Sequence, residues 1–471
     1  MPARFFRKKR EKPWMRMRWG RTNHPHDRNA ICTVFPRTNT TARVTDHRSR
    51  RLENPEMREM AARICRDYLH GVWKHVTAEN IALKRIRSVF DASHAPYSLH
   101  PFSTPPPRDH VVAPLQKRKQ TNVCWLGIVL PVIYVQRTQN TPEKFRQLHA
   151  GTGPRQVLLR LYGQVHGERA LEGLITESVI FTLLSERRLG PKLHGIFPGG
   201  RIEEYIPARP LLTKELADPT LSTMIAEKMA QIHTMQVPIS KEPTWLWDTM
   251  AKWLDTATDI LENIEDIDAR HSKNVNAIRS IDLNHEIDWF SNCLLIDKTG
   301  APVFFLFRSI ATRQKHPVVF CHNDMQEGNI LLRQNTRKPE LVLIDFEYCS
   351  YNYRGFDIAN HFVEWQYDYT EAEYPFFHSV SSKIVTRVVS TISFLWQLNF
   401  IRSYLRTIGK EGQLEEERVM MEVNIFSLAS HLFWGLWSTV NAKLSEIPFG
   451  YWGGGGEIGK EWAMLRADYK M

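Results

Sequence analysis

The sequence predicts an α+β fold, in which a smaller, strand-rich N-terminal part precedes a larger and mainly helical C-terminal part. Of the 471 residues, 42% are apolar and 11% are aromatic, which is enough to build a sizeable core. Short runs that are typical of strands lie between residues 81 and 206. Beyond residue 221, apolar residues recur at helical spacing.

The positive charge of the chain lies at its N-terminus. The net charge is +11, but residues 1–51 hold 15 Lys/Arg against 3 Asp/Glu, and the other residues hold 47 against 48. Because the rest of the chain is close to neutral, we expect no nucleic-acid partner for it. Residues 1–51 are interpreted as a basic, disordered arm. Composition leaves three roles open for this arm: a solvated tail, a mitochondrial-type transit segment or an anchor to an anionic surface.

The six cysteines show neither the paired spacing of a zinc site nor a dense disulfide framework. We therefore expect a reducing, cytoplasmic compartment. The most apolar window, Trp125 to Val135, is too short to cross a bilayer and contains Pro131. The sequence predicts no transmembrane helix and no secretory signal.

The N-terminal elements follow from periodicity. Apolar residues at helical spacing predict a helix from Pro55 to Val72, where the folded part begins. Ile81 to Ile86 and Gln156 to Gly163 are predicted strands, and the second presents Arg160. Glu172 to Arg187 has the pattern of an amphipathic helix.

A hairpin and two long helices come next. Leu193 to Phe197 and Arg201 to Ile206 flank Pro198-Gly199-Gly200, which is a turn signal between strands. Leu221 to Met235 and Trp245 to Leu261 carry apolar stripes that are typical of core helices. We assign no chemistry to these stripes.

The polar residues between positions 321 and 365 have an order that matches a chemical need. Asp324 and Asn329 stand five apart, as in the catalytic loop of protein kinases, and the apolar run Leu341 to Ile344 places Asp345 at a strand end. Either aspartate alone is as readily explained as a cap or a turn residue. Together with Asn329 they indicate phosphoryl transfer, which needs a carboxylate beside the attacking hydroxyl and oxygen ligands for magnesium.

The same stretch resembles the choline/ethanolamine kinase family. The resemblance rests on four segments: His322 to Asn329, Ile344 to Tyr348, Tyr351 to Asp357 and Asn360 to Trp365. It implies transfer of the ATP γ-phosphoryl group to choline, with ethanolamine or both amines as the alternative. It also implies a protein-kinase-like fold with two lobes, a small antiparallel-sheet lobe at residues 52–208 and a helical lobe at residues 209–471.

The resemblance assigns roles to individual residues. Asp324 would orient the choline hydroxyl, while Asn329 and Asp345 would bind Mg²⁺. Arg160 and Gln326 would contact ATP. The hinge, where the backbone would meet adenine, comprises Glu204, Tyr205, Ile206 and Pro207. Glu177 is interpreted either as the partner of Arg160, as in the lysine–glutamate pair of protein kinases, or as an ordinary solvated residue of its helix.

A quaternary ammonium cannot donate hydrogen bonds, so choline recognition calls for aromatic faces and a negative charge. The predicted choline pocket comprises Tyr348, Glu364, Tyr369, Phe376, Trp434 and Trp437. The two tryptophans alone would be better explained as core residues. Their combination with the catalytic loop favours a cage. By resemblance the chain is also expected to form a homodimer, although the sequence shows no interface for one.

Three segments depart from the family pattern. Residues 87–133 contain one glycine, Gly127, and no Gly-rich phosphate loop. They are interpreted as a lineage insertion or as an error of gene prediction, and we favour the error. Residues 293–316 are a second atypical segment. Near the C-terminus, Trp462 either replaces a cage tyrosine or is detached by the glycines that precede it. The missing loop leaves open a catalytically impaired binding protein.

Overall fold

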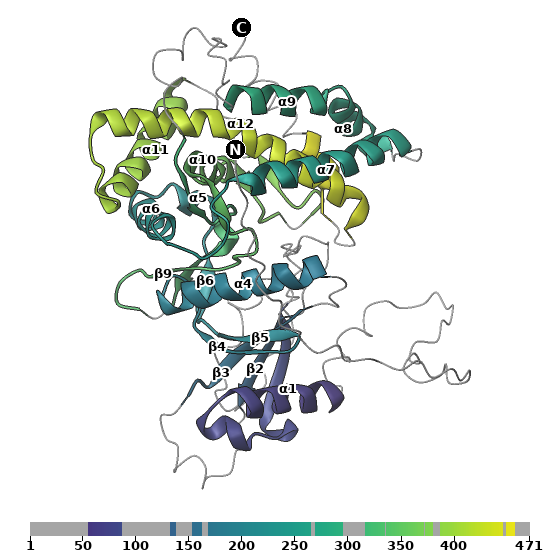
Figure 1. The fold of residues 1–471 in the computed structure, drawn as a ribbon, viewed down its shortest axis with the longest axis vertical. Helices are drawn as coiled ribbons and strands as arrows, with labels where there is room; N and C mark the ends of the chain where they lie inside the picture. The colour runs from purple at the N-terminus through teal and green to yellow at the C-terminus, as the bar shows by residue number, and fades with distance from the viewer. Residues whose placement is uncertain are drawn as a thin grey trace, which may run out of the picture. The chain divides into compact units, whose positions relative to one another are not determined.

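The computed structural model describes residues 55–86, 132–137, 153–162, 168–264, 269–294, 316–334, 336–371, 373–379, 387–445 and 449–456 (Figure 1). Four of the predictions fall wholly or largely outside these ranges. They concern the basic arm at residues 1–51, the atypical segments at residues 87–133 and 293–316, and Trp462.

Five antiparallel strands form the N-terminal sheet, in the order β1-β2-β3-β5-β4. They are β1 (Ile81–Ile86), β2 (Val132–Arg137), β3 (Gln156–Leu161), β4 (Leu193–Phe197) and β5 (Gly200–Glu204). Val132 and Ile133, which we had assigned to the atypical segment, belong to β2 instead. Val132 stands opposite Ile86 on one side and Arg160 on the other. The sheet therefore resumes at Val132, within the segment that the sequence analysis had treated as atypical.

One face of this sheet is covered by helix α1 (Pro55–Tyr68), which the 3-10 helices η2 (Gly71–His75) and η3 (Ala78–Asn80) follow. Ala61 and Cys65 are fully buried and pack in one cluster with Val157 and Ile202 of the sheet. The Trp73 indole donates a hydrogen bond to the Pro154 carbonyl at 2.7 Å. Helix α1 thus packs on the sheet through apolar side chains, and η2 is joined to the segment before β3 by a partly buried hydrogen bond.

The rest of the described chain is mainly helical (Figure 1). Its helices are α4 (Glu168–Glu186), α5 (Thr213–Leu216), α6 (Pro219–His233), α7 (Thr244–Asn263), α8 (Ala269–Arg279), α9 (Leu283–Leu294), α10 (Arg354–Glu364), α11 (Arg387–Thr407) and α12 (Gln413–Leu444). Helix α12 packs against α7 and α10, and α6 packs against α11. Buried side chains of these helices form one large core cluster.

Short strands place the polar stretch against these helices. A three-stranded sheet has the order β6-β8-β9 and comprises β6 (Ala208–Pro210), β8 (Ile330–Arg333) and β9 (Leu341–Leu343). Two further antiparallel pairs are β7 (Val318–Cys321) with β10 (Ser350–Tyr353), and β11 (Tyr367–Asp368) with β12 (His378–Ser379). The 3-10 helix η5 (Glu327–Asn329) precedes β8.

Helix α4 follows β3 in the chain but packs into the large core cluster. Ile180 and Leu184 are buried there, and the Phe181 ring lies 6.1 Å from the Phe346 ring, measured between centroids. At Gly190, a Cβ atom would lie only 2.7 Å from the Phe346 ring, so the close approach at this point requires glycine. Phe346 directly follows Asp345, so α4 is packed against the strand end that carries the predicted metal ligand.

Helix α12 is the one helix of the described residues that is long and apolar enough to cross a membrane by length and composition. Within its most apolar window, 61% of the residues are buried inside the protein. This burial is what the central helix of a protein core shows, so the length and composition of α12 are weak support for a membrane span.

Candidate active site

The loop after β7 holds Asp324 in place through Asn329. The Asn329 side-chain amide donates to the Asp324 carboxylate at 2.8 Å and to the Asp324 carbonyl at 2.9 Å. Both residues lie in the loop and turn between β7 and β8. The five-residue spacing seen in the sequence thus folds one amide directly onto one carboxylate, and the Asn329 side-chain oxygen is not used in these two bonds.

Asp345 follows β9, at the strand end where the sequence predicted it. Its φ angle is +64°, a left-handed conformation that is uncommon for a residue with a side chain. The neighbouring residue Ile344 is held by hydrogen bonds at both its N–H and its carbonyl group. The His322 Nε2 donates to the Ile344 carbonyl at 3.0 Å, and the Ile344 N–H donates to the Asn329 carbonyl at 3.0 Å. The catalytic loop and the strand end therefore form one hydrogen-bonded unit.

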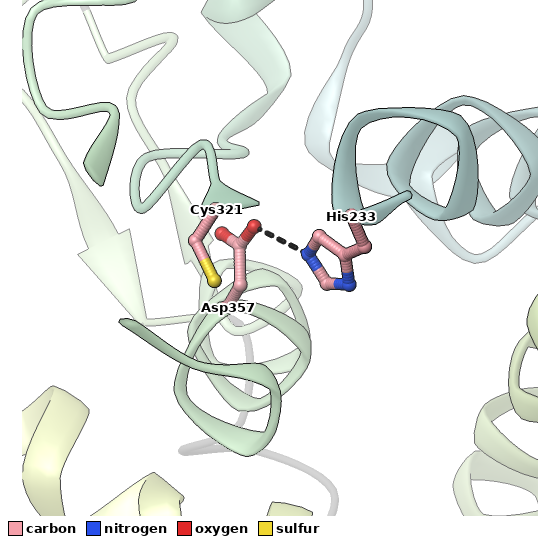
Figure 2. A group of neighbouring side chains, drawn as sticks. All are labelled: His233, Cys321 and Asp357. Atoms are coloured by element: carbon pink, nitrogen blue, oxygen red, sulfur yellow. Dashed lines mark hydrogen bonds and ion pairs between the residues drawn. The ribbon is translucent and has the colours of Figure 1, made fainter. Parts of the chain in front are cut away.

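Asp357 of helix α10 holds the same loop through its carboxylate. Its two carboxylate oxygens accept hydrogen bonds from the backbone N–H groups of His322 and Asn323, at 2.9 and 2.8 Å. The His233 Nε2–H donates to the same carboxylate at 2.9 Å (Figure 2). Burial by itself would raise the pKa of Asp357, but these hydrogen bonds and the His233 ring hold the pKa below its usual value. Asp357 therefore remains ionised and fixes the loop backbone.

Cys321 lies beside Asp357 and His233, and the three ligand-type atoms are within 4.8 Å of one another (Figure 2). The arrangement is better explained as structural than as a metal site. Burial raises the pKa of the Cys321 thiol well above its usual value, so the thiolate that a metal prefers is disfavoured. The other His233 nitrogen, Nδ1, is taken by the Tyr404 hydroxyl at 2.8 Å.

A cavity of about 110 Å³ lies beside the catalytic loop, large enough for a small organic cation. Its wall includes eight of the predicted site residues: Asp324, Gln326, Asp345, Tyr348, Glu364, Tyr369, Trp434 and Trp437. It also includes residues that the sequence did not single out: Glu347, Val363, Tyr367, Phe377, Ser430, His431, Ser438, Phe449 and Gly454. The predicted catalytic and amine-binding groups thus share one pocket.

The cavity brings several buried carboxyl groups close together. Burial raises the pKa of Asp324 well above its usual value, and the neighbouring charges of Glu364 and Asp345 raise it further. The pKa of Glu347 is likewise raised well above its usual value by burial and by Asp345. Burial raises the pKa of Glu364 to about 7, against the hydrogen bond from Tyr369. Because these carboxylates lie close together, the pocket favours cationic ligands.

The residues at the strand end fit a magnesium ion. Burial raises the pKa of Asp345, although Arg160 and His322 oppose the rise. Asp345 and Glu347 in the cavity lining, and the side-chain amide oxygen of Asn329, would offer oxygen donors only, which a hard divalent cation prefers. A divalent cation would also neutralise the charge that burial destabilises.

Aromatic rings form the opposite wall of the pocket. The Trp434 ring lies 5.9 Å from the Tyr348 ring and 5.5 Å from the Trp437 ring, in edge-to-face contacts. The Tyr369 hydroxyl donates to the Glu364 carboxylate at 3.0 Å. One predicted residue, Phe376, lies outside the lining of this cavity, and its place is taken by the next residue.

That next residue, Phe377, is 6% exposed and stacks on Phe449 with ring centroids 5.4 Å apart. Phe376 has a left-handed backbone with φ of +68°. The resemblance had assigned the pocket position to Phe376, whereas the residue that lines the cavity is Phe377.

The glycines near the C-terminus are packed into the structure. Residues 451–456 are helical, and a Cβ atom at Gly454 would lie 2.8 Å from the Ser438 hydroxyl. A Cβ atom at Gly456 would similarly meet the Asn274 side chain at 2.8 Å. The glycines as far as residue 456 are thus close to side chains of α8 and α12, while the segment that carries Trp462 lies outside the described residues.

Arg160 lies in a buried ion-pair cluster next to Asp345. Its guanidinium pairs with Glu203 at 3.0 Å, and Arg201 pairs with the same carboxylate at 2.6 Å. Glu177 of helix α4 pairs with Arg201, so the predicted pairing of Glu177 with Arg160 is wrong. The reason is the register of the sheet, which places Arg201 of β5 directly opposite Arg160 of β3.

The predicted hinge connects β5 to β6 and lies outside the lining of the cavity. The Glu204 carboxylate accepts a hydrogen bond from the Lys192 N–H at 3.0 Å, and the Pro207 carbonyl accepts one from the Gln334 N–H at 2.9 Å. Tyr205 and Ile206 are buried. The hinge residues therefore join the N-terminal sheet to the strands that carry the catalytic loop.

These features define the class of the protein, an α+β chain with a protein-kinase-like fold. A model of the choline/ethanolamine kinase family matches residues 138–457. A choline/ethanolamine kinase of Rattus norvegicus is 44% identical over 309 residues, which cover 64% of this chain and 70% of the relative. Choline kinase A2 of Caenorhabditis elegans is 34% identical over 422 residues, which cover 84% of this chain and 83% of the relative.

The crystal structure of choline kinase from Cryptosporidium parvum has a similar fold, with a TM-score of 0.59 at 22% identity. The similarity covers 87% of this chain and 95% of that one. The chain belongs to the choline/ethanolamine kinase family. The predicted family and fold class are therefore confirmed.

Proposed function

We propose that this protein catalyses the transfer of the ATP γ-phosphoryl group to the hydroxyl of choline. The family makes the chain a kinase that uses ATP. The observation that carries the choice of acceptor is the single cavity that joins Asp324 to an aromatic wall with an acidic residue, Glu364. Such a wall suits an organic cation that carries its own hydroxyl.

In the proposed reaction, the choline oxygen forms a bond to the γ-phosphorus while the bond from that phosphorus to the β–γ bridging oxygen breaks, and ADP leaves. Asp324 orients the hydroxyl and accepts its proton. The Asn329 amide holds the carboxylate in position for this role. Because burial raises the pKa of Asp324, the carboxylate is a better proton acceptor than an exposed aspartate.

Asn329 and Asp345 would hold Mg²⁺, and Glu347 lines the same part of the cavity. When bound, the metal supplies charge neutralisation for the ATP phosphates. On the protein side, the left-handed backbone at Asp345 and the hydrogen bonds at Ile344 fix the carboxylate at the strand end. Fixed oxygen ligands are an electrostatic environment that needs no rearrangement during the reaction.

The nucleotide would lie between the N-terminal sheet and the catalytic loop. Arg160, whose positive charge acts on Asp345, is proposed to contact the ATP phosphates. Gln326 lines the cavity and is proposed to contact ATP as well. The backbone of residues 204–207 is proposed to meet the adenine ring. These assignments follow the family resemblance, and the location of each residue is compatible with them.

The choline ammonium would lie against Tyr348, Trp434 and Trp437, with Glu364 and Tyr369 completing the wall. Phe377 and Phe449 extend this wall and replace the predicted Phe376. The trimethylammonium group would be held by aromatic faces and by the nearby negative charge, because it has no N–H to donate.

Three further points belong to this proposal. The chain would divide into a nucleotide lobe at residues 52–208 and a catalytic lobe at residues 209–471. It would act as a homodimer, by family resemblance. It would work in the cytoplasm, a location supported by the unpaired thiols of Cys65, Cys321 and Cys349 in the described chain.

The test is a phosphocholine assay with purified protein, ATP, magnesium and choline. We expect turnover in the natural protein and a loss on the order of a thousandfold in kcat for Asp324→Asn, since general base catalysis is lost. Asp248→Asn is the matched control, because Asp248 is exposed on helix α7. Nucleotide binding without any product in the natural protein would instead favour the catalytically impaired alternative.

A second candidate function is phosphorylation of ethanolamine, alone or together with choline. The rat relative is named for both amines. The ratio of kcat/KM for the two substrates separates these functions, because only choline gains fully from an aromatic cage.

A further inference from the structure

A chain of buried hydrogen bonds links helix α11 to the catalytic loop through His233 of helix α6. The Tyr404 hydroxyl of α11 lies 2.8 Å from the Nδ1 atom of His233. The Nε2 atom of the same ring lies 2.9 Å from the Asp357 carboxylate (Figure 2). Tyr404, His233 and Asp357 are 1%, 5% and 0% exposed. All three lie outside the lining of the described cavity, so an effect of His233 on the reaction has to act through the loop.

The donor and the acceptor can be assigned in each of these bonds. The ionised Asp357 carboxylate only accepts hydrogen bonds, so Nε2 of His233 donates to it. Burial raises the pKa of Tyr404, so its hydroxyl keeps its hydrogen and can donate to Nδ1. Both nitrogens of the His233 ring therefore have a partner, and the two bonds together fix the orientation of the ring.

Among the described residues, His233 is the side chain that donates a hydrogen bond to Asp357. The nearby Cys321 thiol bonds to backbone carbonyl groups instead. One oxygen of the Asp357 carboxylate accepts from both the His233 ring and the His322 N–H. The second oxygen accepts from the Asn323 N–H. The His233 ring and the two loop N–H groups therefore hold the carboxylate against rotation from opposite sides.

The loop residue Asn323, which directly precedes Asp324, has a left-handed backbone with φ of +66°. This conformation is unfavourable for a residue with a side chain and persists where the surrounding contacts impose it. The Asn323 N–H is held by Asp357, and its side-chain amide donates to the Tyr348 carbonyl and the Ser350 hydroxyl at 2.8 and 2.9 Å. Because Asp324 is the next residue, a change in the backbone of Asn323 changes the direction of the Asp324 carboxylate.

We propose that His233 is a positioning residue for phosphoryl transfer, which holds the Asp357 carboxylate and, through the loop backbone, the direction of Asp324. This inference rests on the proposed function of the site. His233 lies outside the cavity, so it contributes to the rate of the chemical step and not to the binding of ATP or of the amino alcohol. A displacement of about 1 Å at a reacting group costs on the order of a hundredfold in rate, which sets the size of the expected effect.

The first experiment measures kcat and KM in the natural protein and in three variants, with the amino alcohol that the natural protein turns over faster. His233→Leu removes the donor. His233→Gln is the rescue variant, since its amide nitrogen can donate from the place of Nε2. Ile232→Ala is the matched control, because Ile232 is a fully buried apolar residue of the same helix.

We expect His233→Leu to lose about a hundredfold in kcat, while both KM values change by less than about threefold. His233→Gln should lose less than about tenfold, because the bond to Asp357 is restored. Ile232→Ala should lower the thermal transition and leave kcat within about threefold, since a cavity in the core destabilises the fold without moving the loop. Equal losses of kcat in His233→Leu and in either of the other two variants would overturn the inference.

Tyr404→Phe tests the outer bond of the chain. It removes the hydroxyl and keeps the ring, so kcat should fall by about fivefold, equivalent to one hydrogen bond. Added to His233→Leu, the same substitution should cause no further loss, because the hydroxyl acts through the His233 ring. Losses that multiply in the double variant would contradict the proposed chain.

Hydrogen exchange tests the same inference without turnover, because the His322 and Asn323 N–H groups are both bonded to Asp357. Relative to the amides of helix α12, their protection should fall by at least about tenfold in His233→Leu and stay unchanged in Ile232→Ala. Unchanged protection in His233→Leu would overturn the inference.

If the leucine variant does not fold, as judged by its thermal transition, His233→Met replaces it under the same criteria. If the natural protein turns over neither choline nor ethanolamine, the proposed function fails. In that case the exchange of the His322 and Asn323 amides decides by itself whether His233 holds the loop.

Discussion

Two buried clusters of charged residues lie near Asp345, and they differ in whether their positive and negative charges balance. The sheet-side cluster joins two arginines to two glutamates, namely Arg160, Arg201, Glu177 and Glu203. Its positive and negative charges balance. The cavity-side cluster consists of carboxylates alone, namely Asp324, Asp345, Glu347 and Glu364.

The pKa values express the same difference. Although burial opposes it, Arg160 and Arg201 lower the pKa of Glu203, so the sheet-side carboxylate is stabilised as an anion. In the cavity, burial raises the pKa of Asp324, and the neighbouring carboxylates raise it further. The first cluster is complete without a ligand, whereas the second is completed by cations. Removing charge should therefore damage folding in one cluster and activity in the other.

The largest effect is expected at Asp345. Asp345→Asn removes a proposed Mg²⁺ ligand, so kcat should fall by about a thousandfold, as when an electrostatic group is removed from a transition state. The midpoint of the magnesium titration should rise at the same time. Thermal stability should stay equal or increase, because a buried like charge is removed. A variant with lower thermal stability but unchanged kcat would contradict the comparison between the two clusters.

The next effect is expected at Glu203, and it concerns stability. Glu203→Gln leaves the buried Arg160 and Arg201 without their shared carboxylate, so the free energy of unfolding should fall by about 3 kcal/mol. Chemical denaturation measures this change, with the exposed Glu262→Gln as the matched control. An unfolding free energy equal to that of the control variant would show that the balanced cluster is not a source of stability.

A smaller effect is expected at Glu364, whose pKa is raised to about 7 by burial. The carboxyl is charged above this pH and neutral below it, so the attraction for the ammonium is lost as the pH falls through 7. We expect kcat/KM for choline to fall along an acidic limb near pH 7. Glu364→Gln should lose about tenfold at pH 8, equivalent to one charge-assisted contact.

The same variant should show a weaker acidic limb, because one of the titrating groups is gone. The exposed Glu242→Gln is the control for the substitution itself. An unchanged limb in Glu364→Gln would assign the pH dependence to other carboxylates of the cavity.

The smallest effect is expected at Trp437, at the aromatic wall. Trp437→Leu keeps an apolar side chain but removes a π face, so KM for choline should rise about fivefold, the size of one exposed cation–π contact. The unfolding free energy should be measured in parallel, because Trp437 also packs 5.6 Å from the Tyr451 ring. A loss of stability with unchanged KM would make this tryptophan a core residue.

Parts of the fold and of the site could be predicted from the sequence, namely those that a short local pattern determines. The strand at Ile81–Ile86 was predicted with its observed bounds, and helices α6 and α7 were predicted within two residues at each end. Asn329 contacts Asp324 across the five-residue loop, and the antiparallel pairing of β8 with β9 brings the chain at Asp345 back beside this loop. The loop spacing therefore determines their contact.

Residues that depend on long-range packing could not be predicted. Asp357 reads as one acidic residue in a helix, and only the folded chain brings it to the backbone of His322 and to His233. Glu177 was assigned to the wrong arginine because the sheet register is not visible in a single strand. His431 stands three residues before Trp434 on helix α12, but the sequence analysis did not single it out as a residue of the pocket.

Helix α10 carries both Asp357, which fixes the catalytic loop, and Glu364, which faces the proposed amine. The two residues are seven apart, or about two helical turns. One helix therefore both holds the loop that carries the hydroxyl-orienting Asp324, through the N–H groups of His322 and Asn323, and positions the ammonium-facing Glu364. Selection for the length of an amino alcohol, independent of its degree of methylation, is then a property of this helix. Substrates with a longer carbon linker would place either their hydroxyl or their ammonium out of register.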